Sequence, residues 1–408
     1  MNDISLFPER KGDYDFRLDN RTSFAMTGHR PLPHPRAWQA EELRSDVSWI
    51  QRLSEPEVAG FDAALEHARQ LGKDWLDMTG ADFPLNDPAR DALRRAFEST
   101  QTGYGICLLK GFPVQRWSVE DARLVHWGVG LHAGLARPQN RASQVMNDVR
   151  DEGGSYKVKG GRGYNTNAGL DFHGDSCDVV ALLCLKAAKS GGTSLVSSSM
   201  SVCEEIARVR PDLVPVLKAP FHHSYQGAGD PDKPPFYACP ILGDHPEYFA
   251  FRANRKNVIA AQRDFEDVPR LTGAQQEALD LLDELLPDPR FCFSMQLEEG
   301  DMQLLNNYVV LHSRTDFEDH AEPERKRHLL RLWLAIPQSQ PLPAQWETYF
   351  GDVRPGSVRG GVRGSELTAA YLDFEARQAH EKGMQLKPQW RAGEASNPAR
   401  QARTTAAT

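Results

Sequence analysis

Three side chains in this sequence have the types and the spacing of ligands to one metal ion. His173 and Asp175 stand two residues apart in DFHGDSCDVVALLCL, residues 171–185, so on an extended segment both side chains leave the same face. A third ligand must then come from a distant strand, and His312, at the end of an apolar run in GDMQLLNNYVVLHSR (residues 300–314), is the candidate. Two histidines and one carboxylate on one face of iron leave the opposite positions open for oxygen and a co-substrate. Alone, each residue has a structural explanation, since a lone histidine on an apolar strand is more often a hydrogen-bonded core residue.

A basic strand that follows indicates an anionic co-substrate. In ERKRHLLRLWLAIP (residues 324–337), Arg327 and Arg331 share a strand face with Leu329 and Trp333. Two guanidiniums among buried apolar residues are costly unless anions meet them. A dicarboxylate supplies such anions, because the planar fork of arginine binds a carboxylate bidentately. Ordinary internal salt bridges are the alternative.

Together these motifs resemble the taurine dioxygenase-like (TauD/TfdA-type) Fe(II)/2-oxoglutarate-dependent dioxygenases. The resemblance runs from about residue 103 to 337 and is carried, in the family's order, by FHGDSCDVVALLCLKAAKSGGTSLVSS (172–198), GDMQLLNNYVVLHSR and RKRHLLRLWL (325–334). It implies a mostly β fold, with a double-stranded β-helix (jelly-roll, cupin-like) core and helical insertions. It also implies that a small organic substrate is oxidised, and most simply hydroxylated, by O2 while 2-oxoglutarate becomes succinate and CO2.

The resemblance assigns roles to seven residues. The iron ligands are His173, Asp175 and His312. The residues for 2-oxoglutarate are Arg327, Arg331, Ser194 and Thr193. Of these, the first arginine and one of the two hydroxyl residues would hold the far carboxylate, whereas the second arginine would lie nearer the metal-bound end.

The sequence departs from the family pattern in three respects. The interval from His312 to Arg327 is a few residues longer than in the better-known members, which leaves Arg325 as a rival anchor. Gly174 stands between the first two ligands, where threonine is more familiar. The residues that bind the sulfonate in taurine dioxygenase have no convincing match, so taurine is a poor substrate candidate.

Two other classes of protein fit part of the pattern. A zinc-dependent hydrolase would use the same three ligands with an activated water, but it gives the two arginines no purpose. A non-catalytic jelly-roll binding protein would be favoured if one ligand were missing, and none is. Metal analysis combined with an assay for 2-oxoglutarate turnover separates the three classes.

The bulk properties fit a soluble enzyme. The formal charge is 48 − 56 = −8 and the pI is about 5.9, which argues against a nucleic-acid partner. There is no apolar run of about 18 residues for a membrane span, and the N-terminus carries charges where a secretory signal is apolar. Six cysteines without a CxxC spacing suit a reducing compartment. We therefore expect a cytoplasmic location.

The pattern of elements predicts one main domain with loose ends. We expect an extended arm at 1–40, the dioxygenase domain at 41–337, a C-terminal cap at 338–386 and a disordered tail at 387–408. Helices are predicted at 40–71 (broken by Pro56 and Gly60), 87–99, 118–130, 272–286 and 365–382. Strands are predicted at 103–114, 178–185, 193–197, 248–252, 291–297, 302–305 and 328–336.

Several polar segments are candidates to line the substrate pocket, although each also fits ordinary loop structure. They are Asn165, Asn167, Gln139, Asn140 and the Gly-rich loop 143–163, which is long enough to be a lid. The His222–His223 pair is predicted to be structural. The Gly/Arg-rich segment 354–364 is expected to be either a cap over the site or a contact between subunits of a homo-oligomer.

Overall fold

The computed structural model describes residues 37–140, 142–155, 161, 163–227, 234–362 and 367–387. Nearly all of the predicted arm and tail lies outside these residues, as does part of the predicted lid. Within the described ranges, no helix has both the length and the apolar character that a membrane crossing requires.

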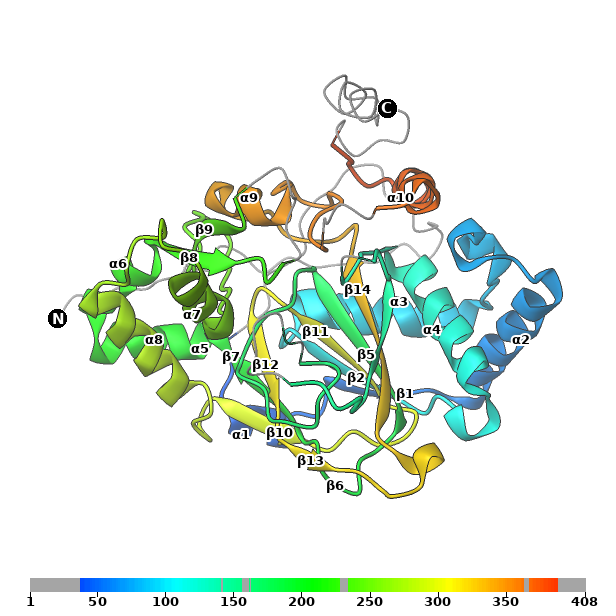
Figure 1. The fold of residues 1–408 in the computed structure, drawn as a ribbon. Coiled ribbons are helices and arrows are strands. Elements are labelled where there is room, and N and C mark those ends of the chain that lie inside the picture. Colours follow the sequence, from blue (N-terminus) through cyan, green and yellow to red (C-terminus); the bar gives the residue numbers. More distant parts are fainter. Residues whose placement is uncertain are drawn as a thin grey trace, which may run out of the picture.

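The larger of the two main sheets has seven strands (Figure 1). Their order is β1 (Ile50–Arg52), β2 (Ile106–Lys110), β11 (Met302–Asn306), β5 (Val179–Lys186), β14 (His328–Ala335) and β3 (Leu135–Ala136), with β4 (Met146–Val149) also paired to β14. All pairs are antiparallel except β1 with β2. The central strands read as nearly continuous apolar runs because both of their faces are buried.

Helices cover the outer face of this sheet. Leu183 on β5 and Leu330 on β14 pack in one core with apolar residues of these helices. The helices are α2 (Glu55–Leu71), α3 (Asp87–Thr102), α4 (Val119–Ala133) and α10 (Ala369–Glu381). Val180 and Leu329 point to the opposite face and join a second core. The one-residue alternation of the strands therefore separates the two cores.

The smaller sheet closes the second core. It consists of β10 (Cys292–Met295), β7 (Ser194–Ser198) and β12 (Val310–Arg314), in that order. Two further two-stranded antiparallel pairs are formed, one by β6 (Ser190–Gly191) with β13 (Phe317–Glu318), which are distant in the chain, and one by β8 (Pro220–Ser224) with β9 (Phe236–Pro240). The remaining helices are α1 (Ala40–Ser45), α5 (Ser199–Val209), α6 (Val214–Leu217), α7 (Arg255–Asp264), α8 (Gly273–Leu285) and α9 (Glu347–Phe350). In Figure 1, α6 to α9 gather with β8 and β9 on the side of the molecule away from α2.

Three sequence-based element assignments were wrong. Pro56 and Gly60 do not break a helix, because α2 begins only at Glu55 and Pro56 sits in its first turn, where no N–H donor is needed. Gly60 permits close helix packing, since a Cβ there would lie 2.1 Å from Oδ1 of Asn86. The predicted loop 143–163 contains strand β4, and 248–252 makes only an isolated bridge from Phe251 to Leu242 instead of a regular strand.

Candidate metal centre

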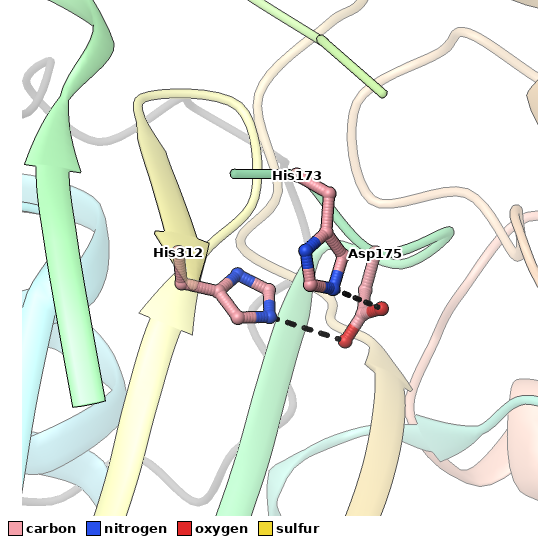
Figure 2. Close-up of side chains that lie close together, drawn as sticks. All are labelled: His173, Asp175 and His312. Carbon is pink, nitrogen blue, oxygen red and sulfur yellow. Dashed lines mark ion pairs between the residues drawn. The ribbon is translucent and has the colours of Figure 1, made fainter. Parts of the chain in front are cut away.

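The three predicted metal ligands meet between the two sheets. His173 precedes β5 and is paired through its backbone with His312 on β12, with both N–H···O distances at 3.0 Å. Directly paired residues of an antiparallel bridge project to the same side, so the two rings lie 4.4 Å apart, centroid to centroid. Asp175 follows two residues after His173 and points to the same place (Figure 2).

The donor atoms converge as a facial metal site requires. One ligand atom from each of the three residues lies within 4.8 Å of the others. Nε2 of His173 is 3.8 Å from Oδ1 of Asp175, and Nε2 of His312 is 3.7 Å from Oδ2 (Figure 2). Nδ1 of His173 lies 2.9 Å from the carbonyl oxygen of Asp171, so this nitrogen carries the proton and Nε2 keeps its lone pair.

The electrostatics of the site suit a divalent cation. Burial lowers the pKa of His312 to about 3, so its ring is neutral. Burial opposes ionisation of Asp175, but Arg331 and then His312 and His173 bring the pKa of that carboxyl below its usual value. Oδ2 of Asp175 is buried without a hydrogen-bond partner. The neutral ring of His312 and the ionised, unsatisfied carboxylate of Asp175 are the ligand states that metal binding needs.

Asn307 fixes the backbone of the second ligand. Its Oδ1 accepts the Asp175 N–H at 2.9 Å, and its Nδ2 lies 3.2 Å from Sγ of Cys177. Gly174 fits closely here, since an added Cβ would lie 3.1 Å from the Asn307 carbonyl oxygen. Burial raises the pKa of Cys177 well above its usual value, so this thiol is a neutral packing residue. The sequence analysis assigned Asn307 no role.

Arg331 lies beside the metal ligands. Its Nη1 is 3.7 Å from Oδ1 of Asp175, and its Nε donates to Oε1 of Gln139 at 2.8 Å. The amide of Gln139 also donates to the Arg331 carbonyl, so a residue predicted to line the pocket positions this guanidinium. The distance to Asp175 exceeds a hydrogen bond, which leaves the head group available to another anion.

Arg327 is buried, and among the residues that the structure describes no carboxylate forms an ion pair with it. It is 5% exposed, its Nη1 has no hydrogen-bond partner, and its guanidinium lies 5.1 Å from the centre of the Phe317 ring. Gly192 passes so close that a Cβ there would meet Nε at 3.1 Å. The rival Arg325 instead lies at the surface beside Glu322. The structure thus gives Arg327 the properties of an unfilled anion site.

Ser194 and Arg314 stand opposite each other across β7 and β12, on the face that carries His312. The Ser194 hydroxyl bonds to the buried amide of Gln303 at 3.0 Å, whereas Thr193 points its hydroxyl to Gln296 near the surface. Arg314 has a buried Nη1 without a partner and packs on Phe317 at 4.7 Å. Burial, followed by Arg327, lowers the pKa of Arg314 to about 9. The sequence analysis did not single out Arg314, although its position two residues after His312 places both side chains on the same strand face.

Other predicted positions have structural contacts. The Asn165 carbonyl accepts N–H groups of Glu152 and Gly154, and the Asn167 carbonyl accepts the Phe317 N–H. Asn140 bonds to Gln144. His222 and His223 belong to hairpin β8–β9 and are not part of the metal-ligand cluster found among the described residues.

The family model described as "Taurine catabolism dioxygenase TauD, TfdA family" matches residues 35–333. The chain belongs to this family. The resemblance predicted from the three motifs is therefore confirmed, and with it the reaction class, that of an Fe(II)/2-oxoglutarate-dependent dioxygenase.

Individual relatives of this dioxygenase support the same placement. The chain is 31% identical over 326 residues to "FR-33289 synthase" of Streptomyces rubellomurinus (strain ATCC 31215), covering 78% of this chain and 95% of the relative. It is 26% identical over 333 residues to "Taurine hydroxylase-like protein SAT17" of Stachybotrys chartarum, covering 78% and 83%.

Solved structures share the fold at low identity. An asparagine oxygenase in complex with Fe(II), 2S,3S-3-hydroxyasparagine and succinate matches with a TM-score of 0.53 and 18% identity, covering 71% of this chain and 94% of the other. The non-heme iron oxygenase OrfP in complex with Fe and alpha-ketoglutaric acid matches with a TM-score of 0.51 and 15% identity, covering 70% and 94%.

Proposed function

We propose that this dioxygenase holds Fe(II) through His173, Asp175 and His312 and hydroxylates a small organic molecule. The observation that carries the proposal is the convergence of two imidazole nitrogens and one carboxylate close to two arginines. Among the described residues, Arg331 has an ion-pair contact only with Asp175, at 3.7 Å, and Arg327 has none. Bound iron and 2-oxoglutarate together supply the activation of O2 and the oxidising power for breaking a C–H bond.

The residues of the chain bind and orient the co-substrate. Arg327, with the hydroxyl of Ser194, is proposed to hold the far carboxylate of 2-oxoglutarate, and Arg314 adds positive charge on the same side of Phe317. Arg331, which Gln139 holds next to Asp175, is proposed to face the metal-bound end. Each guanidinium is buried or nearly so, which strengthens its interaction with a carboxylate by excluding water. We propose Ser194 in preference to Thr193 because only the former points inward.

The second ligand favours hydroxylation over halogenation. Asp175 would supply a carboxylate ligand to the metal at the position that a halide would otherwise take. Asn307 and the backbone of Ser176 hold this residue in place, since Gly361 N–H of the C-terminal segment donates to the Ser176 carbonyl at 2.7 Å. The Gly/Arg-rich segment thus contacts its own chain, which supports its proposed role as part of a cap at 338–386.

The two sheets fit the jelly roll that the family implies. From β5 onward the chain passes repeatedly between the two sheets: β5 is in the larger sheet, β7 and β10 in the smaller, β11 in the larger, β12 in the smaller and β14 in the larger, and their pairs are antiparallel. Alternation of this kind is typical of a double-sheet jelly roll. We propose this core for the domain at 41–337, and a cytoplasmic location stays a prediction from the sequence.

The proposal is tested by metal-dependent turnover of 2-oxoglutarate. The purified chain should convert 2-oxoglutarate to succinate with O2 and Fe(II), and should lose that activity when Zn(II) replaces iron. A zinc-dependent hydrolase would be most active with Zn(II) and indifferent to 2-oxoglutarate. A non-catalytic binding protein would form no succinate with either metal. A panel of small organic acids and amino acids that stimulate succinate formation would then narrow the substrate.

A further inference from the structure

Another buried cation, Arg252, lies on the other side of the candidate metal ligands from the proposed co-substrate site. Arg252 is 1% exposed, and its Nε and Nη1 atoms are buried without a hydrogen-bond partner. Its remaining nitrogen, Nη2, donates to the hydroxyl of Tyr237 at 2.5 Å. Among the residues that the structure describes, no carboxylate forms an ion pair with it. A buried guanidinium in this state is costly to the folded protein unless an anion joins it.

The groups around Arg252 are aromatic and neutral. Its guanidinium carbon lies 3.8 Å from the ring centre of Tyr349 on α9 and 5.4 Å from that of Tyr237 on β9. His223 stacks on Tyr237 with 5.1 Å between ring centres. Burial raises the pKa of Tyr237 well above its usual value, and burial followed by Arg252 lowers the pKa of His223 well below its own. Neither ring is an anion at neutral pH, so the positive charge stays uncompensated.

The backbone places Arg252 on the face of the metal ligands. His173 is bridged to His312 on one side and to Asn254 on the other, both in antiparallel fashion. Arg252 and Asn254 are two residues apart on an extended segment, so their side chains leave the same face, which is also the face of the two histidines. Strand geometry puts the Cα atom of Arg252 roughly 8 Å from that of His173, about two residues along and one strand across.

The order of the strands separates Arg252 from the co-substrate residues. Ser194 lies on β7, which pairs with β12; β12 is bridged to His173, and His173 is bridged to the segment that carries Arg252. The metal ligands therefore stand between the two cationic sites. Figure 1 shows the elements around Arg252, namely β8, β9, α7 and α9, grouped beside β7 and β12. Helix α7 also begins at Arg255, so its positive N-terminal end adds to the potential that an anion would meet.

We propose that Arg252 binds an oxyanion group of the prime substrate, which is therefore a small anionic molecule held at one end by this guanidinium. The Tyr237 and Tyr349 rings fix the plane of the guanidinium. Its unpartnered Nε and Nη1 atoms keep N–H groups that can donate to the oxygens of a carboxylate, phosphonate or sulfonate. This inference rests on the proposed function, since it names the substrate class of that same site.

The test is an anaerobic calorimetric titration of the iron-loaded protein with 2-oxoglutarate at saturation, so that the co-substrate site is filled. The probes are propionate, propylphosphonate and propanesulfonate, with neutral propionamide and cationic propylamine as controls. At least one oxyanion should bind at least tenfold more tightly than propionamide. Arg252→Met should abolish this preference, and Arg252→Lys, which keeps the charge, should retain part of it.

Arg255→Met is the matched control. This arginine lies three residues away, but its guanidinium already pairs with Asp280 and Asp283, so its loss should leave the oxyanion preference unchanged. Circular dichroism and thermal melting show whether each variant is folded. The inference is overturned if no oxyanion exceeds propionamide on the wild type, or if folded Arg252→Met or Arg252→Lys variants bind all probes as the wild type does.

Failure of the proposed function would look different. The same samples report it independently, because binding of 2-oxoglutarate to iron in this type of site gives a visible charge-transfer absorption. If that absorption does not form in the wild type, the proposed function fails, and titration of the metal-free chain still tests Arg252. If the absorption forms but the oxyanion preference is absent, only the substrate inference fails.

Discussion

Replacing Arg327 with methionine removes a buried guanidinium that forms no ion pair within the described part of the chain. Losing one partner of a buried charged pair typically costs about 2–5 kcal/mol, and each 1.4 kcal/mol is about tenfold in affinity. Arg314 stays on the same Phe317 ring and still attracts the carboxylate, so we expect the lower end of the range. The dissociation constant of 2-oxoglutarate should rise by about thirtyfold or more, measured by anaerobic titration of the iron-loaded variant, while iron affinity should hardly change.

Arg325→Met is the control for this experiment. Arg325 is 56% exposed in its side chain and lies 3.7 Å from Glu322, so its loss should change the 2-oxoglutarate affinity by less than about twofold. The metal-free Arg327→Met variant should also be no less stable than wild type, because it loses an unpaired buried charge. A large effect of Arg325→Met together with a small effect of Arg327→Met would move the co-substrate anchor and refute this reasoning.

Three further predictions concern stability and the support of the site. Burial lowers the pKa of His132 to about 4, so the unfolded state takes up a proton as the pH falls below about 6.5, and the folded state resists it until about 4. Between neutral pH and about pH 5 this difference in proton uptake lowers the free energy of unfolding by about 2 kcal/mol. Urea denaturation at the two pH values should show that His132→Gln removes most of this contribution. Arg359→Met should lower the free energy of unfolding by about 3–5 kcal/mol, because it leaves the buried carboxylate of Asp178, 2.7 Å away, without its partner; an unchanged urea midpoint would contradict this. Asn307→Ala should weaken iron binding by about 10–100-fold, measured by metal titration, and a wild-type iron affinity would mean that the backbone of Asp175 needs no such support.

Local spacing made the convergence of the three candidate ligands predictable. A separation of two residues fixes one face on any extended segment, so His173 and Asp175 could be paired from the sequence alone. His312 and Arg327 followed from apolar runs that could only be buried strands. The same logic located helices α3, α4, α8 and α10, and Ser118 and Thr272 cap helices that begin one residue later, whereas α5, α6, α7 and α9 were not predicted. These patterns depend only on a few neighbouring residues, so they can be recognised without the tertiary structure.

The rest of the site depends on contacts between distant segments. Arg252 lies on a stretch with no regular strand pattern, and its burial requires Tyr237 from a hairpin and Tyr349 from a short helix almost one hundred residues later. The partnership of Gln139 with Arg331 spans 192 positions. Helix α2 was also misjudged because a tertiary contact was unknown. Gly60 is typical of a helix break in the sequence, but in the structure it lies where α3 packs so closely that no side chain fits.

Anaerobic iron titration of the wild type and of single ligand variants tests the central claim most directly. The wild type should bind one Fe(II) per chain and develop the charge-transfer absorption when 2-oxoglutarate is added. His173→Ala, Asp175→Ala and His312→Ala should each lose that absorption while remaining folded. Stoichiometric iron and an unchanged absorption in the His312→Ala variant would contradict the three-residue site on which the account is built.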